Sequence, residues 1–376
     1  MADEVWFWHR IVSPHMAGLA DALAATGREV TFVAEQEMSS ARAAQGWQTP
    51  GRGKAHRRVA PSIEAVRALV AAAPPDSIHI CQAFRGNGLI HAARHALAER
   101  GLRQWAIMET VDDAGWKGIL KRLEYGRLLK AWRPKLEGVL AIGHRTPAWL
   151  TQRGAANEKI FPFTYFLQPP ELRDVRTIPL GRAFRLVFVG QFIERKRVDL
   201  LLDALSTLTD VNFELAVIGS GPLEAGLRAK ADAILPGRVR WLGRQPITEV
   251  PGLLAEADCL VLPSRHDGWG AVVSEALMVG TPAICSDACG SAGVVAASGE
   301  GGIFHAGGRQ ALIDVLRQVI SSGSLPLDRR HRLADWACCL SADAGARYLS
   351  AILAHVSAPR TQLRPDPPWA ELERRG

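Results

Sequence analysis

Short apolar runs alternate with longer stretches whose apolar residues recur every three or four positions along most of the chain. Runs of the first kind favour buried strands, and stretches of the second kind favour amphipathic helices. Strands are predicted at 5–9, 29–34, 77–81, 104–108, 138–142, 185–190, 214–219, 238–242, 259–263, 282–286 and 302–304. Helices are predicted at 14–25, 62–73, 88–100, 116–135, 198–208, 222–234, 248–256, 270–279 and 308–321. Strands that alternate with helices predict an α/β fold with parallel sheets covered on both faces.

A cluster of prolines and charged residues between 166 and 182 interrupts this alternation. Such a cluster is typical of a linker, and a chain of 376 residues is too long for one ordinary hydrophobic core. We therefore predict two Rossmann-like domains. The predicted parts are a first domain over 1–167, a linker over 168–183, a second domain over 184–340, and a helix and tail over 341–376 that either crosses back to the first domain or is loose.

Composition and charge narrow the class of protein. The chain has no apolar run of about 18 residues, and its acidic start lacks the basic and apolar regions of a secretory signal. The six cysteines have no metal-binding spacing, so we interpret them as reduced thiols of a cytosolic protein. The net charge of +7 fits phosphate-bearing ligands or an anionic membrane surface, and no motif supports nucleic-acid binding.

The segment 263–283 carries the strongest chemical signal. A predicted strand is followed by a turn at Gly268 and Gly270, and then by a helix that stops at Gly280. The amides of Gly268, Trp269 and Gly270 stand at the start of this helix. They suit a diphosphate, because the helix dipole favours negative charge there.

Two acids belong to the same segment. Glu275 is a lone acid among apolar residues of the predicted helix, and Asp267 stands just before the helix. A carboxylate in apolar surroundings needs partners, which two ribose hydroxyls would supply to Glu275. Asp267 can accept hydroxyls from a sugar beyond the phosphates. The alternative is an acid at a helix start and a glutamate on a solvated helix face, which the segment as a whole disfavours.

The spacing Asp267-x7-Glu275 resembles the Glu-x7-Glu signature of glycosyltransferase family 4, with aspartate in place of the first glutamate. The resemblance is specific over about 185–295 and looser over 1–165. It implies a GT-B fold, in which two Rossmann-like domains face each other across a cleft. It also implies a retaining, metal-independent transfer from a nucleotide diphosphate sugar, with Glu275 on the ribose and Asp267 on the donor sugar.

The loop after the strand at 185–190 is similar to a loop of the same family that carries a basic pair for the diphosphate. Lys196 matches the family's lysine, whereas Gln191 stands where the family often has arginine. Arg195 or Arg197 can supply the second positive charge, and a solvated basic loop is the alternative. Positive charge at this place is chemically apt, because negative charge grows on the leaving diphosphate.

Gly219 and Gly221 match the Gly-x-Gly-Pro turn that lines the nucleotide side of the cleft in this family. By itself a Gly-x-Gly pair is a weak signal. A dinucleotide-binding motif would need a third glycine or alanine where Glu224 stands, so a dehydrogenase is disfavoured.

The predicted first domain offers fewer candidates. Ser13 is a good helix cap, and His15 in the first turn is a candidate contact for the acceptor or the donor phosphate. Glu109 ends a predicted strand and is a candidate for orienting acceptor hydroxyls, with a plain polar strand end as the alternative. We expect His79 to be a packed strand residue. A histidine that lies near the donor sugar in the family falls at Cys81, which departs from the pattern.

The segment 116–135 combines seven basic residues with one acid, Glu124, and with regularly spaced apolar residues. This pattern is typical of a helix with one core face and one solvated face. It is also typical of a basic amphipathic helix on an anionic membrane. We favour the first interpretation. The second would fit peripheral membrane contact and a lipid-linked acceptor.

These features predict a cytoplasmic retaining glycosyltransferase, working in the cytosol or at the inner face of the membrane. It would move a hexose from a UDP-sugar or GDP-sugar to a glycan or lipid-linked acceptor in polysaccharide or cell-envelope synthesis. The catalytic candidates are Asp267, Lys196 and Glu109. No cofactor is expected. The resemblance implies that no metal is needed, and the absence of an Asp-x-Asp pair from the chain agrees with this. Two alternatives stay open, a nucleotide-sugar epimerase on the same fold and a catalytically inactive nucleotide-binding homologue.

Overall fold

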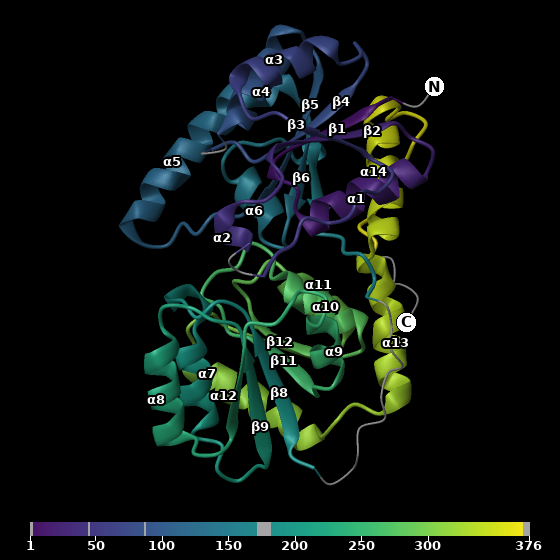
Figure 1. Ribbon diagram of the computed structural model, residues 1–376. Helices are drawn as coiled ribbons and strands as arrows, with labels where there is room; N and C mark the ends of the chain where they lie inside the picture. The colour runs from purple at the N-terminus through teal and green to yellow at the C-terminus, as the bar shows by residue number, and fades with distance from the viewer. Residues whose placement is uncertain (1–2, 44–45, 86–87, 171–181, 371–376) are drawn as a thin grey trace. The chain divides into compact units, whose positions relative to one another are not determined.

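The structure, a computed structural model, describes residues 3–43, 46–85, 88–170 and 182–370 (Figure 1). The chain divides into two compact units. Unit 1 comprises Met1–Gln168 and Leu340–Arg374, and unit 2 comprises Pro169–Cys339. Most of the predicted linker, 171–181, lies outside the described residues. No helix in the described part of the chain is long and apolar enough to cross a membrane.

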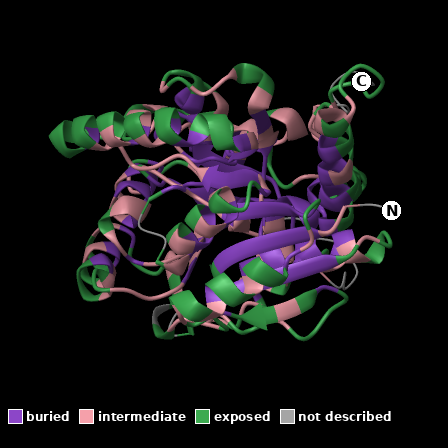
Figure 2. Ribbon diagram, turned by 90° about the horizontal axis from the view of Figure 1, so that it is seen from above, coloured by how far each residue is buried: buried purple, intermediate pink, exposed green. Residues whose placement is uncertain are grey.

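Unit 1 contains a seven-stranded sheet whose paired strands are all parallel. The strand order is β3-β2-β1-β4-β5-β6-β7. The strands are β1 (Val5–Ile11), β2 (Val30–Gln36), β3 (His56–Val59), β4 (Ile78–Gln82), β5 (Arg103–Glu109), β6 (Leu136–Ile142) and β7 (Ile160–Phe163). Buried residues concentrate in the strands other than β3, and exposed residues lie on the outer sides of the helices (Figure 2).

Helices cover both faces of this sheet. The helices α3 (Ile63–Ala72) and α4 (Leu89–Glu99) pack on the face that carries Trp6 and Trp8. On the other side of the sheet, α1 (Pro14–Ala25) packs on β2, and α14 (Ala342–Ser357) packs on α1 (Figure 1). The unit also contains α2 (Ser40–Ala43), α5 (Gly115–Trp132) and α6 (Thr146–Thr151).

The described part of the C-terminal tail also belongs to unit 1. The Trp369 ring lies 6.4 Å from the Phe166 ring, and Arg364 donates to the Glu158 carbonyl at 3.0 Å. The tail beyond α14 therefore packs on the unit as far as residue 370.

Unit 2 contains a six-stranded sheet, again with parallel pairing. Its order is β10-β9-β8-β11-β12-β13. The strands are β8 (Phe184–Val189), β9 (Phe213–Ile218), β10 (Val239–Gly243), β11 (Cys259–Leu262), β12 (Ala283–Ser286) and β13 (Gly301–Phe304). The helices are α7 (Val198–Leu205), α8 (Glu224–Ile234), α9 (Val250–Ala255), α10 (Ala271–Met278), α11 (Ala292–Ser298), α12 (Arg309–Ser322) and α13 (Leu327–Ala337). α12 packs with α7, and α13 packs with α10.

The strand orders confirm the predicted fold class of two Rossmann-like sheets. In each unit the first strand lies in the interior of the sheet, and the order reverses beside it. This reversal point lies between β1 and β4 in unit 1 and between β8 and β11 in unit 2. Ligands of open parallel sheets bind beyond the carboxyl ends of the strands at such a point, because the loops diverge there.

The starts of the unit 2 strands are joined by a buried ion pair. The Asp258 side chain, just before β11, is fully buried and accepts hydrogen bonds from Arg182 at 2.6 and 3.0 Å. It also accepts a hydrogen bond from the Arg185 amide at 2.7 Å. A buried carboxylate with these partners fixes the beginning of β8 against the beginning of β11.

Candidate functional site

Two loops of unit 2 meet at the point where its strand order reverses. After β8 the chain forms a 3-10 turn over Glu194–Lys196, and after β11 it forms the loop that contains Asp267. Lys196 Nζ lies 2.5 Å from Asp267 Oδ2, although the two residues are 71 positions apart in the sequence. The backbone joins the same loops, because the Arg265 amide donates to the Arg195 carbonyl at 2.8 Å. The fold therefore brings together two of the catalytic candidates.

Arg195 adds a second positive charge to this pair. Its Nη1 donates to the His266 carbonyl at 2.8 Å and lies 3.8 Å from Asp267 Oδ1. The Lys196 and Asp267 side chains are only 13% and 14% exposed, so protein rather than water surrounds most of their charge. Two cations beside one carboxylate leave a net positive charge, which suits an anionic group such as a diphosphate.

Gln191 lies on the same loop, and its carbonyl accepts from the Ile193 amide at 3.1 Å. Arg197, the other basic residue of this loop, has a left-handed backbone with φ 54° and pairs with Asp199 at 3.1 Å. Of the two arginines beside Lys196, Arg195 is thus the one that contacts the loop after β11.

The start of α10 presents backbone groups. Its N-cap, Gly270, has φ 85°, and no side chain caps the first amides of the helix. The Trp269 ring is buried, and its Nε1 donates to Ser274 Oγ at 3.1 Å, so only the Trp269 backbone remains for a ligand. The loop after β12 packs closely against the loop before α10, because a Cβ on Gly290 would collide with the Gly268 carbonyl oxygen. The arrangement has the form of an anion site at a helix start.

Glu275 lies one turn into α10 and is half-buried. In the part of the chain that the structure describes, no hydrogen bond or ion pair reaches its carboxylate. Burial raises the pKa of Glu275 from 4.5 to about 7, and no partner lowers it again. Hydroxyl groups of a ligand would give this carboxylate the donors that it lacks.

The glycines of the turn after β9 serve the packing of the loops. The Gly219 backbone has φ 137°, and a Cβ there would collide with the Gly190 carbonyl oxygen. A Cβ on Gly221 would press on the backbone of Phe192, whose amide donates to the Ser220 carbonyl at 3.0 Å. These contacts hold the turn after β9 against the loop that leads to Lys196. The glycines thus shape the site, and no contact between them and a ligand is needed to explain them.

The candidates of the first half all lie in unit 1. Ser13 caps α1, because its side chain accepts from the Met16 amide at 3.4 Å. The ring of His15 lies 5.3 Å from Trp47 and 5.8 Å from Tyr165. Burial lowers the pKa of His15 to about 4, helped by the charge of Arg42, so the ring is neutral at pH 7. Glu109 is the last residue of β5 and is half-buried.

His79 and Cys81 both lie inside unit 1. His79 accepts from Trp8 Nε1 at 3.1 Å and contacts Ser77 Oγ at 2.8 Å, so it is the packed strand residue that we expect. Cys81 is fully buried in the core between the sheet and the α3–α4 pair, and burial raises the pKa of its thiol to about 11. A protonated thiol inside the core replaces no histidine at a sugar site.

His9 is a candidate that the sequence analysis does not single out. It lies near the carboxyl end of β1, is 5% exposed, and stacks on Phe32 at 5.3 Å. Its Nε2 has no hydrogen-bond partner among the described residues. Burial lowers the pKa of His9 to about 3 against the effect of a hydrogen bond with Gln82, so the ring is neutral. His9 directly follows the unbroken apolar run Val5–Trp8 of a predicted buried strand, and this position could have identified it.

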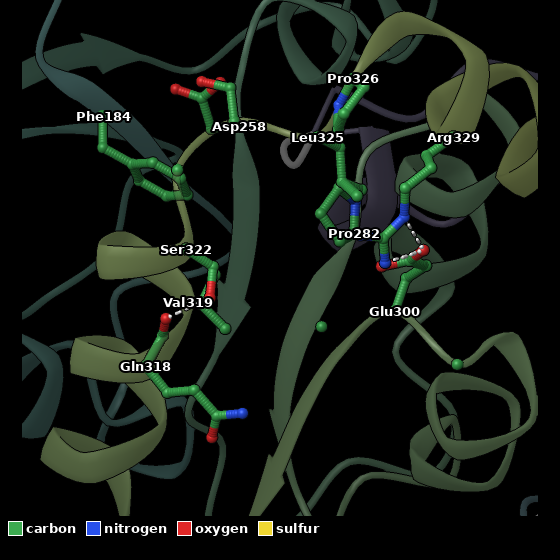
Figure 3. A pocket seen from close by; sticks show the side chains of 14 residues that line it. Phe184, Asp258, Pro282, Glu300, Gln318, Val319, Ser322, Leu325, Pro326 and Arg329 are labelled. Carbon is green, nitrogen blue, oxygen red and sulfur yellow. Dashed lines mark hydrogen bonds and ion pairs between the residues drawn. The ribbon is translucent and has the colours of Figure 1, made fainter.

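A cavity of about 230 Å³ lies at the opposite edge of the unit 2 sheet (Figure 3). It is lined by Phe184, Asp258, Pro282 and Gly301, which stand at or just before the starts of strands. Glu300 and Arg329 point toward each other on one wall. Because the site of a Rossmann-like sheet lies at the carboxyl ends of the strands, this cavity is not part of the candidate site.

Comparison with solved structures decides the fold. The apo form of the lipopolysaccharide outer core galactosyltransferase WaaB matches with a TM-score of 0.68 at 17% identity, over 93% of this chain and 99% of that chain. Anabaena Alr3699/HepE in complex with UDP matches with a TM-score of 0.72 at 13% identity, over 94% of this chain and all of that chain. The chain has the GT-B fold. Identities this low speak to the fold alone.

Sequence comparison supports the unit 2 motifs. Residues 171–337 match the family model described as Glycosyl transferases group 1, which is less than half of the chain. The amylovoran biosynthesis glycosyltransferase AmsK of Erwinia amylovora is 31% identical over 176 residues, or 44% of this chain and 43% of that protein. A GDP-mannose-dependent alpha-(1-6)-phosphatidylinositol dimannoside mannosyltransferase of Mycobacterium tuberculosis is 36% identical over 103 residues, or 27% of this chain and 26% of that protein. The matched regions thus span less than half of these relatives.

Proposed function

We propose that this protein is a retaining glycosyltransferase that moves a hexose from a UDP-sugar or GDP-sugar to a glycan or lipid-linked acceptor. The observation that carries the proposal is the Lys196–Asp267 pair at the reversal point of the unit 2 sheet, beside a helix start and Glu275, whose carboxylate has no partner among the described residues. The match to group 1 glycosyltransferases over 171–337 includes all three residues. AmsK is named for amylovoran biosynthesis, which supports a role in polysaccharide or envelope glycan synthesis.

In this proposal the diphosphate of the donor takes the place of Asp267 as the partner of the Lys196 ammonium group. The ammonium group pairs with Asp267 at 2.5 Å, and a diphosphate would compete for it with two or more negative charges. Arg195 and the first amides of α10 share the diphosphate. The Asp267 carboxylate is then free to accept hydroxyls of the donor sugar, and Glu275 accepts the ribose hydroxyls.

The chemical step needs charge stabilisation more than a protein base. The bond between the sugar C1 and the diphosphate oxygen breaks, and its electron pair stays on the leaving diphosphate. The acceptor hydroxyl forms the new bond to C1 from the same face and gives its proton to a leaving phosphate oxygen. Lys196 and Arg195 stabilise the charge that develops on that phosphate, and we propose that they do so without a metal ion.

We place the reaction in the cytoplasm. All six cysteines are free thiols in the structure, and Cys81, Cys259, Cys285 and Cys289 are buried. Unpaired cysteines fit a reducing compartment. In unit 1, we assign His15 and Ser13 to the acceptor or the donor phosphate, and Glu109 to the acceptor hydroxyls. We assign His9 to the acceptor or the donor sugar.

The test is nucleotide binding and sugar transfer by the full chain. Thermal stability is measured with UDP, GDP, ADP, dTDP and NAD, and the sugars of the stabilising nucleotide are then tested for transfer. The variant Lys196→Met is expected to lose turnover. Its matched control is Lys230→Met on α8, which breaks another lysine–aspartate pair of unit 2, with Asp203 of α7 at 2.6 Å. Equal loss in both variants, or full activity in both, contradicts the role of Lys196.

The same assays separate the alternatives. Binding of one nucleotide without transfer to any acceptor indicates the inactive homologue. Stabilisation by none of the nucleotides overturns the site assignment. Nothing in the fold or in the matched proteins points to the epimerase, which would convert the donor sugar without an acceptor.

A further inference from the structure

The first half of α5 exposes an apolar surface. Trp116, Ile119, Leu120 and Leu123 are 69%, 52%, 58% and 58% exposed. The described residues include ten exposed large apolar side chains, and four of them lie on these two turns of one helix. Scattered single apolar residues are normal on a protein surface, whereas a contiguous group marks an interaction site. We call these four residues the α5 stripe.

The α5 stripe lies on the side of the helix away from the core. Successive residues of a helix are rotated by about 100°, so the four side chains point within about 60° of one direction. The core side of α5 is formed by Tyr125, Leu129 and Trp132, which are buried. These three residues point about 180° away from the stripe by the same rotation. The helix therefore has one core face and one solvated face, as the favoured interpretation predicts, but the solvated face carries large apolar side chains in its first half.

Basic residues surround and continue the stripe. Lys117, Arg127 and Lys130 are exposed, and the last two fall on the stripe side of the helix by the same rotation. The helix has one acidic residue, Glu124, which pairs with Arg85 at 2.7 Å. Figure 1 shows α5 running along the outside of unit 1. The outward face of α5 is thus apolar in its first half and positively charged in its second half.

We propose that this face docks on an anionic lipid bilayer. An indole and three aliphatic side chains suit the boundary between lipid headgroups and acyl chains, and lysine and arginine beside them suit anionic headgroups. A second copy of this chain fits less well, because two positively charged faces would repel each other. α5 is not apolar enough to span the bilayer, so it would lie in the surface. This inference goes beyond the proposed function, since neither nucleotide binding nor transfer requires it.

The experiment is flotation of the full chain with lipid vesicles. One vesicle type contains phosphatidylcholine alone, and the other contains about 30% phosphatidylglycerol. We expect binding to the anionic vesicles, weakened when the salt rises from about 0.1 to about 0.5 M. The triple variant Ile119→Ser, Leu120→Ser and Leu123→Ser should lower the vesicle partition coefficient at least about tenfold.

Two comparisons keep the result interpretable. A control variant with Leu327→Ser and Leu363→Ser removes exposed leucines elsewhere and should bind vesicles like the natural chain. Arg127→Glu with Lys130→Glu should abolish the preference for anionic vesicles. Equal vesicle binding by the triple serine variant and the natural chain overturns the proposal. Self-association without lipid that the triple variant abolishes also overturns it, in favour of a second copy. Nucleotide binding by the triple variant is expected to stay unchanged, so this outcome is independent of the proposed function.

Discussion

The carboxylate of Glu275 should lower the free energy of unfolding of the protein without nucleotide and raise the affinity for the nucleotide. The variant Glu275→Gln separates these two effects. Glu275 is half-buried on α10 without a partner among the described residues, and burial raises its pKa from 4.5 to about 7. Glutamine keeps the size of the side chain and removes its charge. The variant therefore tests whether an unpaired carboxylate is held in the site for a ligand.

The magnitude follows from the shift of the pKa. A shift from 4.5 to about 7 corresponds to about 3 kcal/mol, since each pKa unit is worth about 1.4 kcal/mol. Partial exposure reduces the effect, so we expect about 1–3 kcal/mol. Between pH 4.5 and about 7 the folded protein keeps a proton that the unfolded chain releases, so the stability falls as the pH rises. Relative to the natural chain, Glu275→Gln should gain about 1–3 kcal/mol between pH 4.5 and pH 8.

Nucleotide binding should change in the opposite direction. A hydrogen bond from a hydroxyl to a charged acceptor is worth about 1.5–3 kcal/mol, and glutamine offers only one neutral acceptor oxygen. We expect Glu275→Gln to weaken binding of the nucleoside diphosphate by about 10-fold to 100-fold at pH 8. For the natural chain, affinity should fall as the pH drops through about 7, because the carboxylate takes up a proton.

The assays are urea unfolding at pH 4.5 and at pH 8, and calorimetric titration with the nucleotide that stabilises the protein. The matched control is Glu249→Gln, an exposed glutamate at the start of α9, which should alter neither quantity. If Glu275→Gln shows the same stability difference at both pH values, the carboxylate is not desolvated as described. Unchanged nucleotide affinity would refute its role on the ribose.

Three further substitutions test other parts of unit 2. Asp267→Asn should keep or strengthen diphosphate binding, because it removes the competing partner of Lys196, while turnover falls by about 100-fold. Weaker diphosphate binding in calorimetry would contradict the exchange of partners at Lys196. Gly219→Ala should destabilise the protein by more than about 2 kcal/mol in urea unfolding, because its φ of 137° and the Gly190 carbonyl leave no room for a Cβ. Stability near that of the natural chain would mean that the loop shifts at little cost in free energy. Arg182→Met should lower the free energy of unfolding by about 3–5 kcal/mol in the same assay, because it leaves the fully buried Asp258 carboxylate without its ion-pair partner. A loss below about 1 kcal/mol would show that the hydrogen bond from the Arg185 amide is enough to stabilise this carboxylate.

Most of the fold could be predicted because periodic apolar residues mark the interior strands and long helices of a parallel sheet. The prediction misses two edge strands, β3 and β7. The strand β3 reads His-Arg-Arg-Val, is mostly exposed, and pairs on one side only, with β2. Pro162 lies within β7, where an edge position tolerates the missing amide hydrogen. The predicted helix at 116–135 ends earlier, at Trp132, where the chain enters a 3-10 turn that contains Pro134.

The sequence by itself determined the alternation of strands and helices and the local motif that places Asp267 before a helix and Glu275 within it. Local spacing suffices there, because the residues share one turn and one helix. Only the tertiary structure decided that Lys196 meets Asp267, since that contact depends on β8 and β11 being neighbours in the sheet. It also decided which side of α5 is buried. An apolar period shows that a helix has apolar faces, but only packing determines which of two such faces meets the core.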